Sequence, residues 1–399
     1  SAGTQEPMAT WTFKWSSLRR VTSDGSYIAE IDGLRFIAIL SVLLFHIGRM
    51  TEINFGNYVP SGNALADFLP TMLFHGGRGV ELFFAISGMI LGMPFAKHYL
   101  LGERAVDLKK YFIRRLTRLE PPYIVNLLMR LPLIAGAKHM TFREVLPHFF
   151  ASLFYLHGMI YATWPVVHPP SWSLEIEVQF YILAPLFALL AFRHGAVVRR
   201  TIFACIIVGA SILQARVSPQ DARFHLSILE FVQYFLVGFL LADLYVTSFS
   251  KWKASWIWDV ASVPMWLAIF HLADNTAHFV LPVLTFVVYV GAFKGKLINF
   301  ILRTPLVSTI GGMCYSIYLT HSLVLQGVYV VFRKAPLLQG FYEHLLVGMA
   351  LITPVLIAFG ALFFVLVERP CMDKNWPRKL ANWFNARRDS REVALPTEA

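Results

Sequence analysis

The sequence is poor in charged residues and in cysteine. Asp, Glu, Lys and Arg together make up 15% of the 399 residues, whereas a soluble domain carries about 25%. The three cysteines, Cys205, Cys314 and Cys371, stand far apart, so they indicate neither a disulfide framework nor a metal site. The sequence also contains no G-x-S-x-G elbow, no P-loop, no G-x-G-x-x-G and no H-E-x-x-H. These absences argue against a soluble domain and against the mechanisms that those motifs serve.

Apolar residues dominate what is present. They make up 56% of the chain, and the mean hydropathy is +0.57, which predicts an all-α polytopic membrane protein. The net charge is +11, but the basic residues fall between apolar runs and form no aromatic and basic platform. We therefore expect the lipid bilayer, and no nucleic acid, to be a partner.

About ten transmembrane helices are predicted from runs of apolar residues bounded by turns or charges. Basic residues cluster in alternate loops, and placing all of these clusters inside makes the ten spans consistent with both termini in the cytoplasm. The predicted spans are 34–50, 79–97, 120–137, 172–192, 201–217, 226–247, 255–272, 277–293, 306–331 and 344–367.

Residues 145–163 are apolar and aromatic but contain Pro147, His148 and His157. If this segment crossed the membrane, the basic residues 193–200 would face outside. We therefore predict one re-entrant or interfacial segment on the outer side, which requires a neighbouring cavity or protein surface.

Composition divides the chain into three parts. Residues 1–26 form a polar, basic cytoplasmic N-terminal segment, whose first seven residues are set aside as a variable leader. Residues 27–370 form the transmembrane domain, and residues 371–399 form a polar, basic cytoplasmic tail.

The first span carries two ionisable residues, Arg35 and His46. They are eleven residues apart, so on a helix they share a face and lie about 16 Å apart along the axis. His46 could be a packing histidine bonded to a neighbouring backbone. A second intramembrane histidine, His321, favours a shared polar cavity in which a neutral imidazole takes a proton from a hydroxyl group.

Arginines follow at Arg114, Arg115 and Arg118. They could simply anchor the next span at the inner face. However, Arg115 and Arg118 are three residues apart and share a helix face, and Arg35 lies at the same predicted depth. Converging guanidinium groups bind phosphate groups well, so these residues are candidates for a phosphate-rich cofactor.

Carboxylates occur at the outer entry of two spans. Ser173 could cap a helix that carries Glu175 and Glu177 in its first turns. Glu177 is followed by apolar residues and is expected at membrane depth, where it could orient His46 or hold an acceptor hydroxyl. Glu81 opens the second span in a similar way.

Taken together, these residues resemble the acyltransferase 3 family of multipass membrane proteins, over about residues 27–371. IDGLRFIAILSVLLFH is similar to the first helix of that family, whose Arg-x10-His pattern falls on Arg35 and His46. RRLTR is similar to the family's Arg-x-x-Arg motif, which falls on Arg115 and Arg118.

Four further motifs extend the resemblance. GVELFFAISGMILG is similar to G-V-D-L-F-F-x-I-S-G-F, with Glu81 in place of Asp. WSLEIEVQFY is similar to W-S-L-x-x-E-x-Q-F-Y, and SIYLTHSLV and VERP resemble the late helix and the closing motif. These motifs carry over Glu177, Gln179 and His321, and more weakly Glu368 and Arg369, while Glu175 lies outside the strict pattern.

The resemblance implies transfer of an acyl group, commonly acetyl, from cytoplasmic acyl-CoA to a hydroxyl of an extracytoplasmic glycan or a lipid-linked or secondary-metabolite acceptor. It implies a bacterial inner-membrane protein that uses acyl-CoA as co-substrate and no metal. Some members add a C-terminal hydrolase-like domain of the SGNH type. This chain ends about thirty residues after its last predicted span, so it is expected to complete the transfer alone or with a separate partner; self-association is left open.

The predicted mechanism places the CoA phosphates on Arg35, Arg115 and Arg118, with Arg114 beside them. His46 acts as general base on the acceptor hydroxyl, and Glu177, Glu81 or His321 orients it. Glu175, Trp172, Ser173 and Gln179 are the candidates for acceptor binding.

Two other interpretations remain. The first is a transporter or flippase for an anionic or lipid-linked solute, with His46 and His321 as a proton relay, although no internal repeat with paired broken helices is visible. The second is a membrane acyltransferase with a His/Asn pair. It fits less well, because Asn126, the one intramembrane asparagine candidate, is near no second histidine in the sequence.

Overall fold

The computed structural model describes residues 27–137, 140–217, 221–334 and 340–373, together with Leu18 and Trp376. Within these residues every regular element is a helix, as expected where the backbone must satisfy its own hydrogen bonds in a bilayer. The predicted N-terminal segment 1–26 and tail 371–399 fall almost entirely outside the described residues.

Eight helices of the described chain are long and apolar enough to cross a membrane. They correspond to eight of the predicted spans. These helices are α1 (Ala29–Phe55), α3 (Gly79–Leu101), α7 (Trp172–Phe192), α8 (Ala196–Arg216), α10 (Ile228–Thr247), α12 (Asp274–Lys294), α15 (Cys314–Phe332) and α16 (Phe341–Phe363).

The two remaining predicted spans are also helical but do not meet both criteria. α4 (Leu108–Ala137) covers the predicted span 120–137 and begins in the basic stretch before it. α11 (Trp256–Ile269) has 14 residues, or about 21 Å of helix, against about 30 Å of hydrocarbon. Helices therefore occupy all ten predicted positions, while the number of crossings stays a prediction.

Shorter helices connect the long ones. They are α2 (Ala64–Phe74), α5 (Phe142–Leu153), α6 (His157–Tyr161), α9 (Ala222–His225), α13 (Leu297–Leu302), α14 (Pro305–Gly312) and α17 (Arg369–Cys371), with η2 (Gly76–Arg78), η3 (Pro169–Ser171) and the π-helical turn η4 (Phe364–Glu368).

The segment 145–163 is divided between α5 and α6. The backbone enters the left-handed region at Tyr155 (φ 57°) and Ala162 (φ 52°), which ends each helix. The helices have 12 and 5 residues, too few to cross a bilayer. The segment is thus not a spanning helix, in agreement with the prediction.

The predicted span 306–331 is two helices, which corrects the sequence-based expectation. α14 ends at Gly312 and α15 begins at Cys314, with Met313 between them. A Cβ atom on Gly311 would lie 1.7 Å from the carbonyl oxygen of Asp32 on α1. The glycine therefore lets α14 approach the α1 backbone, a contact that the apolar pattern of the segment does not reveal.

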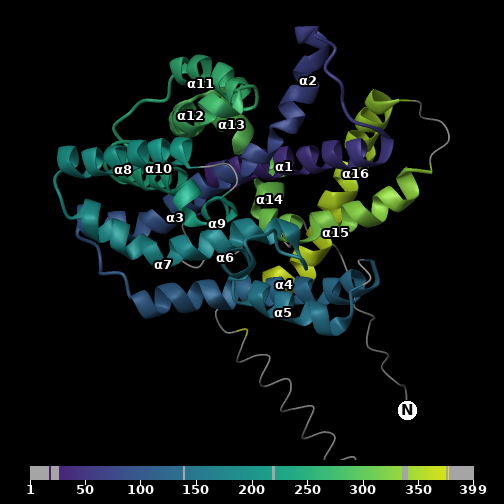
Figure 1. Ribbon diagram of the computed structural model, residues 1–399. Coiled ribbons are helices and arrows are strands. Elements are labelled where there is room, and N and C mark those ends of the chain that lie inside the picture. The colour runs from purple at the N-terminus through teal and green to yellow at the C-terminus, as the bar shows by residue number, and fades with distance from the viewer. Residues whose placement is uncertain are drawn as a thin grey trace, which may run out of the picture.

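α1 lies in the middle of the bundle (Figure 1). Its residues Leu34 and Ala38 belong to an apolar core built with α3, α7, α10 and α12. Leu43 and Ile47 belong to a second core built with α15 and α16. A third core joins α4 and α5 to α7 and α15. α1 therefore lies between the first two cores, and its side chains contribute to both.

The contact between α3 and α10 depends on a pair of glycines. A Cβ atom on Gly88 would lie 2.0 Å from the Phe235 carbonyl oxygen, and one on Gly238 would lie 2.2 Å from the Ala85 carbonyl oxygen. Small residues at a helix crossing allow close backbone packing in a membrane. This pair fixes α3 against α10 beside α1.

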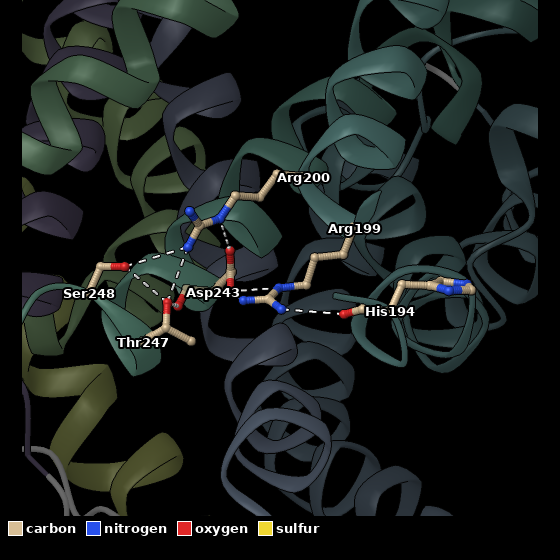
Figure 2. Close-up of polar contacts among 6 residues, drawn as sticks. All are labelled: His194, Arg199, Arg200, Asp243, Thr247 and Ser248. Carbon is tan, nitrogen blue, oxygen red and sulfur yellow. Dashed lines mark hydrogen bonds and ion pairs between the residues drawn. The ribbon is translucent and has the colours of Figure 1, made fainter. Parts of the chain in front are cut away.

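A buried charged cluster joins α8 to α10 at the end predicted to face the cytoplasm. Oδ1 of Asp243 accepts hydrogen bonds from Nε and Nη2 of Arg199, at 2.9 and 2.7 Å, and Oδ2 accepts one from Nε of Arg200 at 2.6 Å (Figure 2). Arg199 also donates to the carbonyl oxygen of His194, and Figure 2 shows the His194 ring directed away from the cluster. These basic residues therefore hold two helices together, in addition to any effect on orientation.

Candidate active site

His46 and His321 meet between α1 and α15, as the sequence predicts. The centroids of their rings are 5.0 Å apart. His321 is fully buried, and its Nδ1 lies 2.5 Å from the carbonyl oxygen of Tyr318. A carbonyl oxygen can only accept, so Nδ1 carries the proton and Nε2 of the neutral ring keeps a free lone pair.

Neither imidazole is saturated by hydrogen bonds. His321 Nε2 is buried without a partner, and no hydrogen bond joins His46 to another described residue. A packing histidine is normally held by a backbone or side-chain partner. The pair is therefore available to a ligand or to water.

A third histidine, His168, joins this cluster from the turn before η3: its ring centroid is 6.1 Å from that of Tyr318, which is 5.9 Å from that of His321. It is fully buried, and neither ring nitrogen has a hydrogen-bond partner. Burial, together with the neighbouring Arg130, His321 and His46, holds the pKa of His168 well below its usual range. Sequence reasoning missed His168 because it lies outside the predicted spans. Its place among apolar residues and prolines, just before the WSLEIE motif, was the available signal.

Arg130 on α4 is the second residue that sequence reasoning missed. It is 2% exposed and interacts electrostatically with His168 and His321. Its Nε donates to Asn126 Oδ1 at 3.0 Å. An arginine inside the predicted span 120–137 was a visible signal, since charge at that depth is expensive.

Asn126 on α4 accepts a hydrogen bond from Arg130 and contacts α15, and among the described residues no hydrogen bond joins it to a histidine. It is fully buried, and its Nδ2 donates to the carbonyl oxygen of Leu319 at 2.9 Å. Leu319 precedes His321 by two residues on α15. The contact between α4 and α15 brings together residues that are remote in sequence.

Arg35 and Glu177 interact with each other, and Glu177 also interacts with Tyr318, whose ring contacts that of His321. Nη1 of Arg35 donates to Asp32 Oδ1 at 2.6 Å, and Arg35 also interacts electrostatically with Glu177. Glu177 accepts a hydrogen bond from the Ser87 hydroxyl on α3. Among the described residues no hydrogen bond or ion pair joins Glu177 to His46, so a direct orienting contact is not formed.

Three arginines of α4 were predicted to bind phosphate, and each has a different environment. The Arg115 guanidinium stacks over Tyr111 and Tyr181, at 4.3 and 5.3 Å from the ring centroids. Arg118 Nη2 is 4.0 Å from Glu368 Oε1, and Arg114 is exposed.

These arginines are connected to Arg35 through α7. Tyr181 interacts with both Glu177 and Arg115, and Glu177 interacts with Arg35. Arg35 and Arg115 thus belong to one polar region of the described chain, and aromatic and acidic neighbours already partner both of them.

Glu81 belongs to a different polar group. Its electrostatic partners are Arg78, Glu230 and Asp274, and Arg78 donates to Asp274 Oδ1 at 2.7 Å. Within the described chain no hydrogen bond, ion pair or ring contact links Glu81 to either imidazole of the pair. The predicted role of Glu81 in orienting His46 therefore gains no geometric support.

The four residues predicted to bind the acceptor do not lie together either. Ser173 Oγ is 3.0 Å from the Tyr318 hydroxyl, next to the histidine cluster. Glu175 Oε2 accepts from the Gly158 amide at 2.8 Å, and Gln179 Oε1 accepts from the Ile228 amide at 2.8 Å. Trp172 packs between aromatic rings of Phe84, Trp164 and Phe231. Three of the four therefore hold neighbouring segments in place, while Ser173 lies at the site.

The described residues contain no group of three or more His, Cys, Asp or Glu side chains that could hold a metal ion. The arrangement is a cluster of three imidazoles and one guanidinium, most of it buried, with a separate arginine-rich region joined to it by α1. Such a cluster can take a proton from a ligand and can stabilise negative charge.

Comparison with known proteins gives one family and several relatives. Residues 28–368 match the family described as an acyltransferase domain. The provisionally named O-acetyltransferase SACOL0978 of Staphylococcus aureus (strain COL) is 25% identical over 392 residues, which cover 90% of this chain and 59% of that relative. O-acetyltransferase OatA of Staphylococcus aureus (strain NCTC 8325 / PS 47) is 24% identical over 234 residues, which cover 55% of this chain and 35% of that relative.

The chain thus spans about three fifths of the length of the first of these relatives. No solved structure matches it.

Proposed function

The chain belongs to the acyltransferase-domain family, and from this premise we propose that it transfers an acyl group, acetyl in our expectation, from cytoplasmic acyl-CoA to a hydroxyl of an extracytoplasmic glycan, glycolipid or similar acceptor. Apolar helices and family membership support an integral membrane protein, and we place it in a bacterial inner membrane. The names of the two relatives support acetyl as the group and oxygen as the acceptor atom.

The observation that carries the proposal is the pair of imidazoles, His46 and His321, on helices that meet in the centre of the bundle. In the proposed reaction His46 takes the proton of the acceptor hydroxyl while the hydroxyl oxygen bonds to the acyl carbon. The carbon–sulfur bond then breaks, and the CoA sulfur leaves as a thiolate and recovers that proton from His46. The products are an ester and free CoA.

We propose that the CoA phosphates bind in the region of Arg35, Arg115 and Arg118, with the exposed Arg114 at its edge. Arg118 is a third exposed in its side chain, so a phosphate can reach it without unfolding the helix. The phosphate would replace the long 4.0 Å contact between Arg118 and Glu368 by shorter, charge-assisted hydrogen bonds. Because Arg35 and His46 are about 16 Å apart on α1, the pantetheine arm can connect the two regions.

The base assignment is tested with purified protein and [14C]acetyl-CoA, by release of CoA and by formation of base-labile label. We expect His46→Ala to lower turnover by about 10²–10⁴-fold, the range for loss of a general base. His194→Ala is the matched control, since His194 is an exposed histidine that follows α7. If His46→Ala keeps full turnover, His46 is not the general base.

A further inference from the structure

Arg130 is buried without a carboxylate partner among the described residues. Its guanidinium donates only to neutral acceptors: Asn126 Oδ1 at 3.0 Å, the Leu319 carbonyl oxygen at 3.3 Å and Ser322 Oγ at 2.7 Å. These bonds use Nε and Nη2, and Nη1 has no hydrogen-bond partner in the described part of the chain. A buried arginine that lacks an anion is costly, and in a membrane helix it is a functional candidate by default.

The position of Arg130 relates it to the histidine cluster. Leu319 and Ser322, which accept its hydrogen bonds, lie on either side of His321 in the sequence of α15. Arg130 also interacts electrostatically with His168 and with His321. The positive charge therefore belongs to the same cluster as the imidazoles on which the proposed reaction depends.

On the premise of the proposed function, we infer that Arg130 stabilises the oxyanion that forms on the acyl carbonyl oxygen during transfer. When the acceptor oxygen bonds to the acyl carbon, the carbonyl electron pair moves onto the carbonyl oxygen, and Arg130 Nη1 donates a hydrogen bond to it. The electron pair returns to re-form the carbonyl as the carbon–sulfur bond breaks, and the arginine neither gains nor loses a proton.

The surrounding contacts favour this role over simple helix packing. Asn126 already joins α4 to α15 through its own bond to Leu319, so a neutral side chain at position 130 would preserve the contact between the helices. Three bonds hold the guanidinium in one orientation, which is the preorganisation that oxyanion stabilisation requires.

The experiment compares Arg130→Gln and Arg130→Lys with the unchanged protein in proteoliposomes. The reaction is followed by CoA release from acetyl-CoA, with methyl β-D-glucopyranoside as the hydroxyl probe and with water alone. Loss of one oxyanion donor typically costs about 10²–10³-fold in kcat, so we expect that loss for Arg130→Gln with both acceptors. The KM for acetyl-CoA and for the probe should stay within about threefold, because the interaction forms only in the transition state.

Arg130→Lys keeps the charge but loses the planar fork, and we expect it to recover at least tenfold over Arg130→Gln. Ser322→Ala, which removes one bond to the guanidinium and no charge, should lower kcat by a smaller factor and serves if the glutamine variant fails to fold. Gel filtration and the melting temperature show that each variant is folded.

Two results overturn the inference. One is a folded Arg130→Gln protein with kcat within threefold of the unchanged protein. The other is a loss confined to the KM of the hydroxyl probe with water-dependent CoA release unaffected, which would make Arg130 an acceptor-binding residue. If the unchanged protein releases no CoA from acetyl-CoA under any condition, the proposed function fails, and this result is distinct from both.

Discussion

At the scale of single residues, the histidine cluster holds polar groups whose hydrogen-bonding capacity is incompletely used by the described residues. His168 has two unpartnered nitrogens and His321 has one, although buried polar atoms in folded proteins are nearly always paired. The cost of leaving them unpaired is about 1–3 kcal/mol each. Water or a polar ligand that bonds to these nitrogens would remove that cost, as the proposed function requires.

We expect His321→Ala to lower acyl transfer by about 10²-fold, the lower end of the range for acid–base groups. The bond from Nδ1 to the Tyr318 carbonyl fixes the tautomer of His321 and leaves Nε2 free beside His46. Steady-state kinetics with acetyl-CoA checks this, and His194→Ala is again the control. Turnover equal to that of the unchanged protein would show that the second imidazole has no part in the reaction.

Sequence reasoning located His46 and His321 because each is a lone ionisable residue in an apolar run. It missed Arg130 and His168, and it did not place Asn126 against α15. Those relations arise when α4 and the turn before η3 pack against α15. Such contacts depend on segments about 150–190 residues apart in the chain, and no local pattern records them.

At the scale of helices and connecting segments, glycines and buried charges determine which helices touch. The helices were predictable because their apolar runs are long. The break at Met313 was not, because it accompanies the approach of Gly311 to the Asp32 backbone on α1. The charged cluster between α8 and α10 was not predictable either, because two arginines at the end of a span give the same sequence pattern whether or not a buried aspartate on another helix binds them.

We expect Asp243→Ala to destabilise the protein by about 3–5 kcal/mol, because it leaves the buried Arg199 without its anion. Thermal unfolding in detergent measures the change. Arg200→Gln is the matched control and should cost about 1 kcal/mol or less, since Arg200 is partly exposed and the Arg199–Asp243 bonds remain. The transfer rate per folded molecule should be unchanged in both variants, and a specific loss of rate would contradict a purely structural role.

The α5–α6 segment should weaken as the pH falls. Burial, and the nearby His148, lower the pKa of His157 to about 4, against about 6.5 in an unfolded chain. The folded state therefore favours the neutral ring, so its contribution is complete above about pH 6.5 and is lost as the pH falls toward 4. Between pH 7.5 and pH 5 we expect His157 to account for about 1–2 kcal/mol of lost stability.

Melting temperatures at the two pH values, for the unchanged protein and for His157→Asn, check this prediction. The asparagine variant should show the smaller difference between pH 7.5 and pH 5. An equal difference in both proteins would exclude His157 as the titrating group.

At the scale of the whole molecule, α1 connects the two parts of the proposed site, the arginines that bind the CoA phosphates and the histidine cluster. It carries Arg35 near the end predicted to face the cytoplasm and His46 nearer the opposite end, and it lies between the main groups of helices (Figure 1). The acceptor is expected to approach His46 from outside. A transporter built on the same histidines would instead move a solute unchanged, without forming an ester.

The most direct test of this two-sided arrangement uses sealed inside-out membrane vesicles that carry the protein, with [14C]acetyl-CoA supplied only to the exposed cytoplasmic face. We predict base-labile label in the membrane and lumenal fraction for the unchanged protein and for His194→Ala, and background for His46→Ala. Right-side-out vesicles given the same external acetyl-CoA should stay unlabelled. Equal labelling by the His46 variant, or labelling of right-side-out vesicles from external acetyl-CoA, would contradict the account.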